Sequence, residues 1–369
     1  MREGRVSPEA LLALKVSCFS LGVSVDAKAL TRLSDGGKTP VSLHEYPTTG
    51  GITFVVNRNG FVNAPFDGKS CSKPEVHFSW DDAAEEYFIR FRNEEFHVEA
   101  LPLPGYIDLI DAEGTSVRDI VMTHADRLRL SPLNKGCAFG CRFCDLARKK
   151  YVKHPIPQVV GAMRVAQADR LLPAHHVLIS GGTSNTTDRA YFDDVCHTVL
   201  REARMPVDVM MTPRRDSGFV DRYVKWGVYG FALNLEVFDS AMAREITPEK
   251  YRLGRGVWKE AIRRAVDLTG GHGRVRSLLV VGLEPLESTL EGVEFLSRLG
   301  CDPVLSPFRP SPGIALERLA PPSREFLAEL FARATDITSE YGVRLGPRCI
   351  PCQHNTLTLP DDSGDYFFS

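Results

Sequence analysis

The sequence lacks long apolar runs, and none of its hydrophobic stretches reaches the roughly 18 residues that a membrane-spanning helix requires. The most apolar N-terminal stretch, 11–25, contains Lys15, closely follows Glu9 and has no small-residue cleavage pattern after it. We therefore expect no signal peptide and a cytoplasmic protein that makes no membrane contact.

An excess of charge of one sign is also absent. The 45 Lys and Arg residues face 47 Asp and Glu residues, which gives a net charge of −2. Nonspecific nucleic-acid binding needs a positive field, so nucleic acid is not an expected partner. We find no internal repeat and no low-complexity tract. The 43% hydrophobic and 25% charged content is typical of a folded chain, and 369 residues suffice for two to three domains of roughly 150 residues.

From about residue 127, short apolar runs alternate with amphipathic segments. This pattern is typical of βα units around a parallel sheet, and we count six. The expected strands are 127–133, 176–180, 207–212, 230–237, 275–283 and 303–308. The expected helices include 157–168, 189–203, 258–268, 289–299 and 323–341, where apolar residues recur at three- and four-residue steps.

The first 120 residues predict a small β-rich accessory domain. A helix around 8–21 precedes strand-like runs separated by turn-forming residues. These runs are 51–57, 75–80, 87–91 and 96–98. A linker is expected to start near 102–105. We therefore divide the chain into an accessory domain (1–120), an α/β domain (121–342), and a C-terminal Cys-x-x-Cys segment with a polar tail (343–369).

Nine cysteines without an export signal indicate thiols or metal ligands rather than a disulfide framework. Cys137, Cys141 and Cys144 lie in one loop directly after the first strand of the α/β domain. Gly136 and Gly140 allow the tight backbone that turns three thiolates toward one cluster. A cubane cluster has four irons, so three cysteines leave one iron free to bind an exogenous chelator.

A zinc knuckle or buried apolar cysteines are the alternatives for this loop. Structural zinc normally closes a shell of four ligands, and the nearest candidates for the fourth ligand are His124 and His154.

The loop resembles the hallmark of the radical S-adenosylmethionine (radical SAM) superfamily, which has this cysteine spacing with an aromatic residue, here Phe143, before the last cysteine. The resemblance covers roughly 127–340. It implies a partial (β/α)6 barrel of the TIM type and a [4Fe-4S] cluster whose open iron chelates S-adenosylmethionine. Reduction then yields a 5′-deoxyadenosyl radical that abstracts hydrogen from the substrate.

The resemblance extends along the expected barrel. Gly181, Gly182 and Thr183 end the second strand, where glycines let backbone carbonyls approach the methionine amino group of the cofactor. Many members have an acidic residue where Thr183 stands, and an ordinary glycine turn is the alternative. On the fourth strand, Asn234 and Glu236 point to the same face. They resemble the ribose-binding segment of biotin synthase, and the alternative is a satisfied internal hydrogen-bonded pair.

Three further positions follow from the resemblance to the biotin synthase-like branch. Arg255, in preference to Arg252, is expected to bind the S-adenosylmethionine carboxylate. Gly282 is expected beside the adenine, although Glu284-Pro285 departs from the pattern of that branch. Arg309 is expected to hold a substrate carboxylate or phosphate, because its planar fork suits both; pairing with a nearby carboxylate is the alternative.

Cys349 and Cys352 form a Cys-x-x-Cys pair beyond the barrel, which predicts half of a second metal site. An auxiliary iron–sulfur cluster, a structural zinc and a redox-active or reduced thiol pair are the alternatives. Cys71, Cys301 and His354 are candidates to complete the site. A basic run, 148–150 with Lys153, could guide an acidic electron donor such as flavodoxin or ferredoxin to the cluster.

We therefore predict a radical SAM enzyme that acts on a small polar substrate, because the local resemblance is to the biotin synthase branch. Within the enzyme class, the alternatives are modification of a peptide gripped by strand addition to the N-terminal domain, and sulfur insertion from a C-terminal cluster. From another class, the alternative is an iron–sulfur binding or scaffold protein without radical chemistry.

Overall fold

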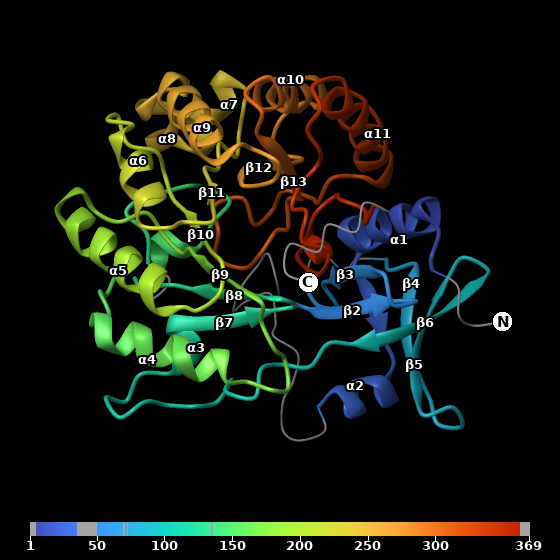
Figure 1. Cartoon of the computed structure of the whole chain (residues 1–369). Coiled ribbons are helices and arrows are strands. Elements are labelled where there is room, and N and C mark those ends of the chain that lie inside the picture. The colour runs from blue at the N-terminus through green and yellow to red at the C-terminus, as the bar shows by residue number, and fades with distance from the viewer. Residues whose placement is uncertain (1–4, 35–49, 69–70, 72, 134–135, 362–369) are drawn as a thin grey trace.

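The chain forms two sheets, each with its own hydrophobic core, in a computed structural model that describes residues 5–34, 50–68, 71, 73–133 and 136–361. The larger sheet curls into a half-barrel with helices on its outer side, and the smaller sheet lies beside it (Figure 1). Most of the expected tail, 362–369, lies outside the described residues. Within them, no helix is both long and apolar enough to span a membrane.

The larger sheet has the strand order β13-β12-β11-β10-β9-β8-β7. Strands β8 to β13 are parallel, and β7 pairs with β8 in the antiparallel sense at the edge. The partial (β/α)6 barrel is confirmed; the sequence did not predict β7. The strands are β7 (Val121–His124), β8 (Arg127–Leu130), β9 (His176–Ile179), β10 (Val207–Met210), β11 (Gly230–Ala232), β12 (Val275–Val281) and β13 (Asp302–Pro307).

The helices cover the outer face of this sheet because their apolar residues recur at helical spacing. In α5 (Arg189–Glu202) the buried residues are Phe192, Val195, Cys196 and Val199. The other helices of this part are α3 (Val117–Ile120), α4 (Ile156–Gln167), α6 (Gly218–Lys225), α7 (Ser240–Ile246), α8 (Pro248–Leu253), α9 (Arg255–Thr269), α10 (Leu286–Ser297) and α11 (Arg324–Glu340). Three single-turn helices are η1 (Leu146–Arg148), η2 (Thr186–Asp188) and η3 (Pro351–Asn355).

The smaller sheet has the order β1-β4-β5-β6-β2-β3 and is antiparallel except for the pair of β1 and β4. Its strands are β1 (Val23–Val25), β2 (Ile52–Val56), β3 (Gly60–Ala64), β4 (Val76–Asp81), β5 (Glu86–Phe91) and β6 (Glu94–Ala100). Helix α1 (Pro8–Leu21) packs on this sheet, and α2 (Ala27–Leu33) follows β1. The sequence predicted four of these strands and missed β1 and β3, which are short.

The segment after α11 joins the two sheets. Its backbone N–H groups at Gly346 and Leu357 donate to carbonyls of β13, at distances of 2.8 and 2.9 Å, so it covers the edge of the barrel sheet. From the other side, the Nζ of Lys15 in α1 donates to the carbonyls of Gln353, Thr356 and Thr358 at 2.8, 3.2 and 2.6 Å. The segment is therefore held between the barrel and the N-terminal layer.

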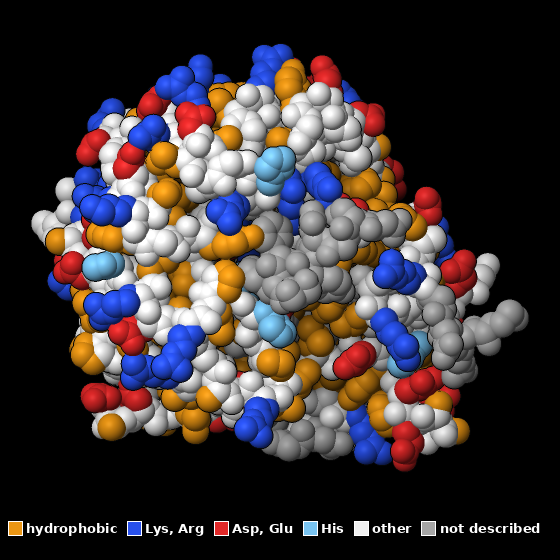
Figure 2. All heavy atoms as spheres, in the orientation of Figure 1, with side chains coloured by type: hydrophobic (Ala, Val, Ile, Leu, Met, Phe, Trp, Pro, Cys, Tyr) orange, Lys and Arg blue, Asp and Glu red, His pale blue; other side chains and the backbone are white. Residues whose placement is uncertain are grey.

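The surface facing the viewer in Figure 2 carries Lys, Arg, Asp and Glu side chains interspersed with one another. This mixture agrees with the net charge of −2.

Candidate active site

A cavity of about 890 Å³ opens at the C-terminal ends of the barrel strands, and Cys137, Cys141 and Cys144 line it. The loop that carries these cysteines follows β8, and the turn of Gly181, Gly182 and Thr183 follows β9 into the same cavity. Parallel barrels place their active sites at this end. The structure therefore brings the two motifs of the sequence together at the position where such a fold performs chemistry.

Backbone hydrogen bonds fix the first cysteine of the loop. The N–H of Ala138 donates to the carbonyl of Thr183 at 2.9 Å, and the N–H of Thr183 points back at the Sγ of Cys137 at 3.2 Å. The N–H of Phe139 also donates to this sulfur, at 3.3 Å. Such donors stabilise a thiolate, because they direct positive dipole ends at the charge.

Gly182 permits this close contact between the two loops. A Cβ atom at this position would lie 1.8 Å from the carbonyl oxygen of Gly136 and 2.4 Å from the Cα of Cys137. Both neighbours are backbone atoms, which cannot be displaced by a simple side-chain rotation. A glycine at 182 is therefore required by the position of the cysteine loop, which is a stronger reason than an ordinary turn.

The thiol groups of Cys141 and Cys144 are largely shielded from solvent. Burial raises the pKa of the Cys144 thiol to about 12, and burial with the nearby Glu236 carboxylate raises the pKa of Cys141 still further. Thiolates at these positions therefore need a cationic partner, and a metal centre supplies one.

The spacing of the sulfurs argues against a single ion in this loop. Within the described part of the chain, only His176, Cys349 and Cys352 bring three ligating atoms within 4.8 Å of one another. At least two of the three loop sulfurs therefore lie more than 4.8 Å apart, whereas two thiolates on one tetrahedral zinc lie about 3.8 Å apart. The expected alternative ligand His154 instead places its Nδ1 3.1 Å from the Oε1 of Gln158.

Asn234 and Glu236 both line the cavity, beyond the end of β11. The Nζ of Lys250 in α8 lies 2.8 Å from the Asn234 carbonyl and 2.8 Å from the Glu236 carboxylate. The Oδ1 of Asn234 accepts from the N–H of Leu278 at 3.2 Å, which leaves its amide nitrogen for a ligand. Glu236 has φ of 73°, a strained conformation that clusters at functional sites. Lys250 was not among the residues that the sequence predicted at the site.

Three residues expected at the site lie elsewhere. Arg255 donates to the carbonyl of Phe238 and stacks 3.8 Å above the centre of its ring, outside the cavity lining. Arg252 lines the cavity instead, paired at 3.0 Å with Glu249. The structure therefore brings Arg252, rather than the expected Arg255, to the cavity lining.

Gly282 and Arg309 also lie outside the cavity lining. Gly282 has φ of 95° and faces the ring of Pro322. Arg309 is buried, and its guanidinium donates to the side-chain and main-chain oxygens of Asn63 at 2.5 and 2.6 Å. These hydrogen bonds join β3 to the segment after β13, and the substrate contact expected for Arg309 stays a prediction.

An arginine-rich wall was missed by the sequence analysis. Arg189, Arg214, Arg215 and Arg222 come from separate segments and line the same cavity. Asp193 pairs with Arg214 and Arg222. Within the described residues, no carboxylate lies within ion-pair distance of Arg189 or Arg215. Only the folded arrangement gathers these arginines, since their spacing in sequence shows no pattern.

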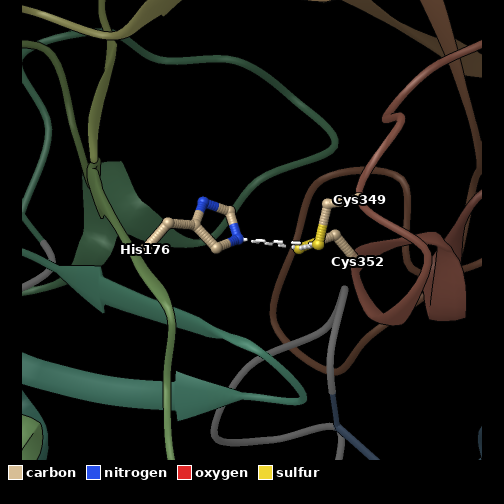
Figure 3. A group of neighbouring side chains, drawn as sticks. All are labelled: His176, Cys349 and Cys352. Carbon is tan, nitrogen blue, oxygen red and sulfur yellow. Dashed lines mark hydrogen bonds between the residues drawn. The ribbon is translucent and has the colours of Figure 1, made fainter. Parts of the chain in front are cut away.

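The Cys349–Cys352 pair lies far from this cavity. Its neighbour is His176, the first residue of β9, as Figure 3 shows. None of the three expected completions takes this place. Cys71 contacts the carbonyl of Val23, Cys301 contacts that of Asp302, and His354 contacts that of Pro351.

The chain is similar to several known proteins over part of its length. No protein-family profile matches the chain. A curated relative, bacteriochlorophyllide c C-7(1)-hydroxylase of Chlorobaculum limnaeum, is 28% identical, and the match covers 56% of this chain and 58% of that protein. The chain therefore matches little more than half the length of this relative.

Solved structures with a similar fold include a radical SAM methyltransferase from Sphaerobacter thermophilus, at 19% identity and a TM-score of 0.47, which covers 76% of this chain and 79% of that one. Another is HydG, a maturase of the [FeFe]-hydrogenase, at 14% identity and a TM-score of 0.48, which covers 60% and 52%.

The structure places the three-cysteine loop at the mouth of a partial (β/α)6 barrel, which is the arrangement expected from the resemblance to the radical SAM superfamily. The narrower resemblance to the biotin synthase-like branch is not confirmed.

Proposed function

We infer that Cys137, Cys141 and Cys144 hold a [4Fe-4S] cluster and that S-adenosylmethionine binds beside it in the cavity. The observation that carries this proposal is the placement of all three cysteines in the lining of a cavity of about 890 Å³. The buried thiols and the backbone cradle at Gly182 both fit such a group. A cluster held by Cys137, Cys141 and Cys144 would, when bound and reduced by one electron, supply the reductive cleavage of S-adenosylmethionine to methionine and a 5′-deoxyadenosyl radical for hydrogen abstraction.

The remaining cavity residues position the cofactor in this proposal. Gly181, Gly182 and Thr183 offer backbone groups to its methionine end, and Phe143 lines the cavity near the last cysteine. Asn234 and Glu236 bind the ribose hydroxyls, since both are polar and face the cavity. The ion pair with Lys250 holds the Glu236 carboxylate in place for this contact. Arg252 replaces Arg255 as the arginine that can reach the cofactor carboxylate.

We infer that the substrate is a small polar molecule that carries an anionic group. Arg189 and Arg215 are exposed on the cavity wall, and neither has a carboxylate partner among the described residues. A planar guanidinium binds carboxylate or phosphate through two parallel hydrogen bonds. Bacteriochlorophyllide c, which the curated relative hydroxylates according to its name, is one candidate to test.

The test is anaerobic reconstitution followed by iron and sulfide analysis and an assay for 5′-deoxyadenosine after chemical reduction. The Cys141→Ala variant is expected to lose the cluster and the cleavage of S-adenosylmethionine. The Cys71→Ala variant is the matched control, because Cys71 lies in the N-terminal part and outside the cavity lining. A wild-type protein that holds one zinc at this loop, with no iron, would refute the proposal.

The anionic-substrate proposal has its own assay. Candidate carboxylic acids are expected to stimulate 5′-deoxyadenosine formation more than their neutral methyl esters, and the preference is expected to shrink in an Arg189→Gln, Arg215→Gln double variant. Equal stimulation by acids and esters would refute the assignment of the arginine wall.

An acidic electron donor such as flavodoxin or ferredoxin remains a proposal for the basic run after the loop. Lys149 pairs with Asp145 at 3.1 Å and Lys153 with Asp188 at 2.8 Å, while Arg148 and Lys150 are exposed. A rate of reduction by flavodoxin that falls as salt rises, and falls again in Lys150→Ala, supports this partner.

A further inference from the structure

We propose that His176, Cys349 and Cys352 bind a single zinc ion, with Asp126 as the fourth ligand, and that this ion fastens the C-terminal segment to the underside of the barrel. The site is separate from the cluster loop and does not depend on the function proposed above. Zinc is assigned because two thiolates, an imidazole and a carboxylate form a tetrahedral donor set that this ion prefers.

The ligating atoms of His176, Cys349 and Cys352 all lie within 4.8 Å of one another. Asp126 lies outside this group, and its side chain must rotate to complete the ligand shell. The Nε2 of His176 lies 3.1 Å from the Sγ of Cys352 and 3.6 Å from the Sγ of Cys349, as Figure 3 shows for the three side chains. The Oδ2 of Asp126 lies 3.7 Å from the Sγ of Cys349. Neighbouring ligands on a tetrahedral zinc lie about 3.5 to 3.8 Å apart, which follows from zinc–nitrogen and zinc–sulfur bonds of about 2.0 and 2.3 Å.

The two sulfurs lie 2.6 Å apart. This separation is longer than a disulfide bond of about 2.05 Å. It is shorter by about 1 Å than the separation of two thiolates on one zinc. Binding of the ion therefore requires the two thiol groups to move apart by about 1 Å, which small rotations about their side-chain bonds provide. A disulfide is the competing state, and the experiment below distinguishes it.

Groups around the ligands are arranged as they are at zinc sites. The Nδ1 of His176, on the far side of the ring from the sulfurs, lies 3.9 Å from the Oδ2 of Asp208. The same carboxylate oxygen is 2.8 Å from the guanidinium of Arg276. At 3.9 Å the Asp208 carboxylate is beyond hydrogen-bond distance, and it lies behind the imidazole where zinc-ligating histidines commonly have a carboxylate. The arrangement presents Nε2 to the ion.

The size of the space favours a single ion over a second iron–sulfur cluster. The cavity beside Cys349 and Cys352 has a volume of about 20 Å³. A single water-sized particle needs about 10 to 15 Å³ on the same measure, so the cavity holds one ion and not several irons with their bridging sulfides.

The position of the site defines its role. His176 begins β9, whereas Gly182 lies beyond the other end of that strand. The four residues of β9 span about 10 Å at about 3.3 Å a step, and the turn of Gly181 and Gly182 lies beyond the far end of the strand. The zinc would therefore join β9 to the segment after α11 on the side of the barrel opposite the cavity. This distance also argues against the alternative in which a C-terminal cluster donates sulfur to a substrate.

The experiment measures zinc and iron per chain in the full-length protein purified anaerobically. We expect one zinc in the wild type, less than a tenth of that in Cys349→Ser and His176→Gln, and one zinc in the control Cys71→Ser. The Cys141→Ala variant is expected to keep its zinc while losing its iron, which separates this proposal from the radical SAM assignment.

A spectroscopic measurement on the wild type covers the case in which the variants fail to fold. Zinc X-ray absorption is expected to show sulfur ligands at about 2.3 Å together with nitrogen or oxygen ligands at about 2.0 to 2.2 Å. Two results overturn the proposal: a Cys349–Cys352 disulfide in zinc-free active protein, found by alkylation and mass spectrometry, or additional iron and sulfide that disappear in Cys349→Ser.

Discussion

Replacing Gly182 by alanine tests the proposed cluster site through a single methyl group. The added Cβ would lie 1.8 Å from the Gly136 carbonyl oxygen, whereas Cβ atoms in proteins essentially never come within 3.0 Å of such a neighbour. The cysteine loop must therefore retreat by about 1 Å. Metal–ligand distances tolerate only about 0.2 Å, so a displaced Cys137 is a poor ligand.

The expected loss of cluster retention follows from the free-energy cost of adding a methyl group to a closely packed place. Forcing a methyl group into a filled place costs about 1 to 3 kcal/mol, and about 2 kcal/mol corresponds to about a 30-fold loss of cluster retention. Stability of the fold should change less, because the strain can relax into the cysteine loop and leaves the barrel core intact.

The assay is iron per chain after anaerobic reconstitution and desalting, alongside the melting temperature. Gly140→Ala is the matched control in the same loop, because a Cβ at that position meets nothing within 4 Å. A Gly182→Ala variant that keeps a full cluster and cleaves S-adenosylmethionine at the wild-type rate would show that the two loops do not need this contact.

Further predictions concern buried charges. Lys15→Met leaves three carbonyls without their donor and should lower the free energy of unfolding by about 3 kcal/mol in urea titrations, whereas the exposed Lys28→Met should not change it measurably. Arg309→Met should lower it by about 2 kcal/mol but leave 5′-deoxyadenosine formation unchanged; a raised substrate KM at wild-type stability would restore the substrate role. Burial opposes ionisation of Asp193, but hydrogen bonds from Arg214 and Tyr223 prevail and lower the pKa of this carboxyl. Asp193→Asn should therefore be destabilised at pH 7, and its deficit should shrink as the pH falls through and below about 3.9; a deficit that does not vary with pH would contradict the argument.

Much of the barrel could be predicted because its strands are buried on both faces and read as apolar runs between amphipathic helices. All six expected strands formed, from β8 to β13, although the structure ends several of them earlier. β11, for example, stops at Ala232, where the chain turns toward the cavity. Edge strands such as β7 and β1 are short and carry too little pattern to be recognised.

Some residues of the candidate site could be predicted from the sequence, and others could not. The cysteine loop could be predicted because its ligands are local in sequence. Lys250, Arg215 and His176 could not, since their roles arise from elements that meet only in the folded barrel. Arg309 shows the converse error. Its position at the end of a strand predicted a ligand contact. In the structure, its guanidinium instead donates hydrogen bonds to Asn63 in the N-terminal sheet.

The contact between Lys15 and the residues after 352 has a consequence for the order of synthesis. The partners are 338 to 343 positions apart in the chain. During translation, the ammonium group of Lys15 must stay hydrated while the whole barrel emerges. Helix α1 can therefore reach its final packing only after nearly all of the described chain has left the ribosome, and premature termination near residue 340 would leave the first helix without its anchor.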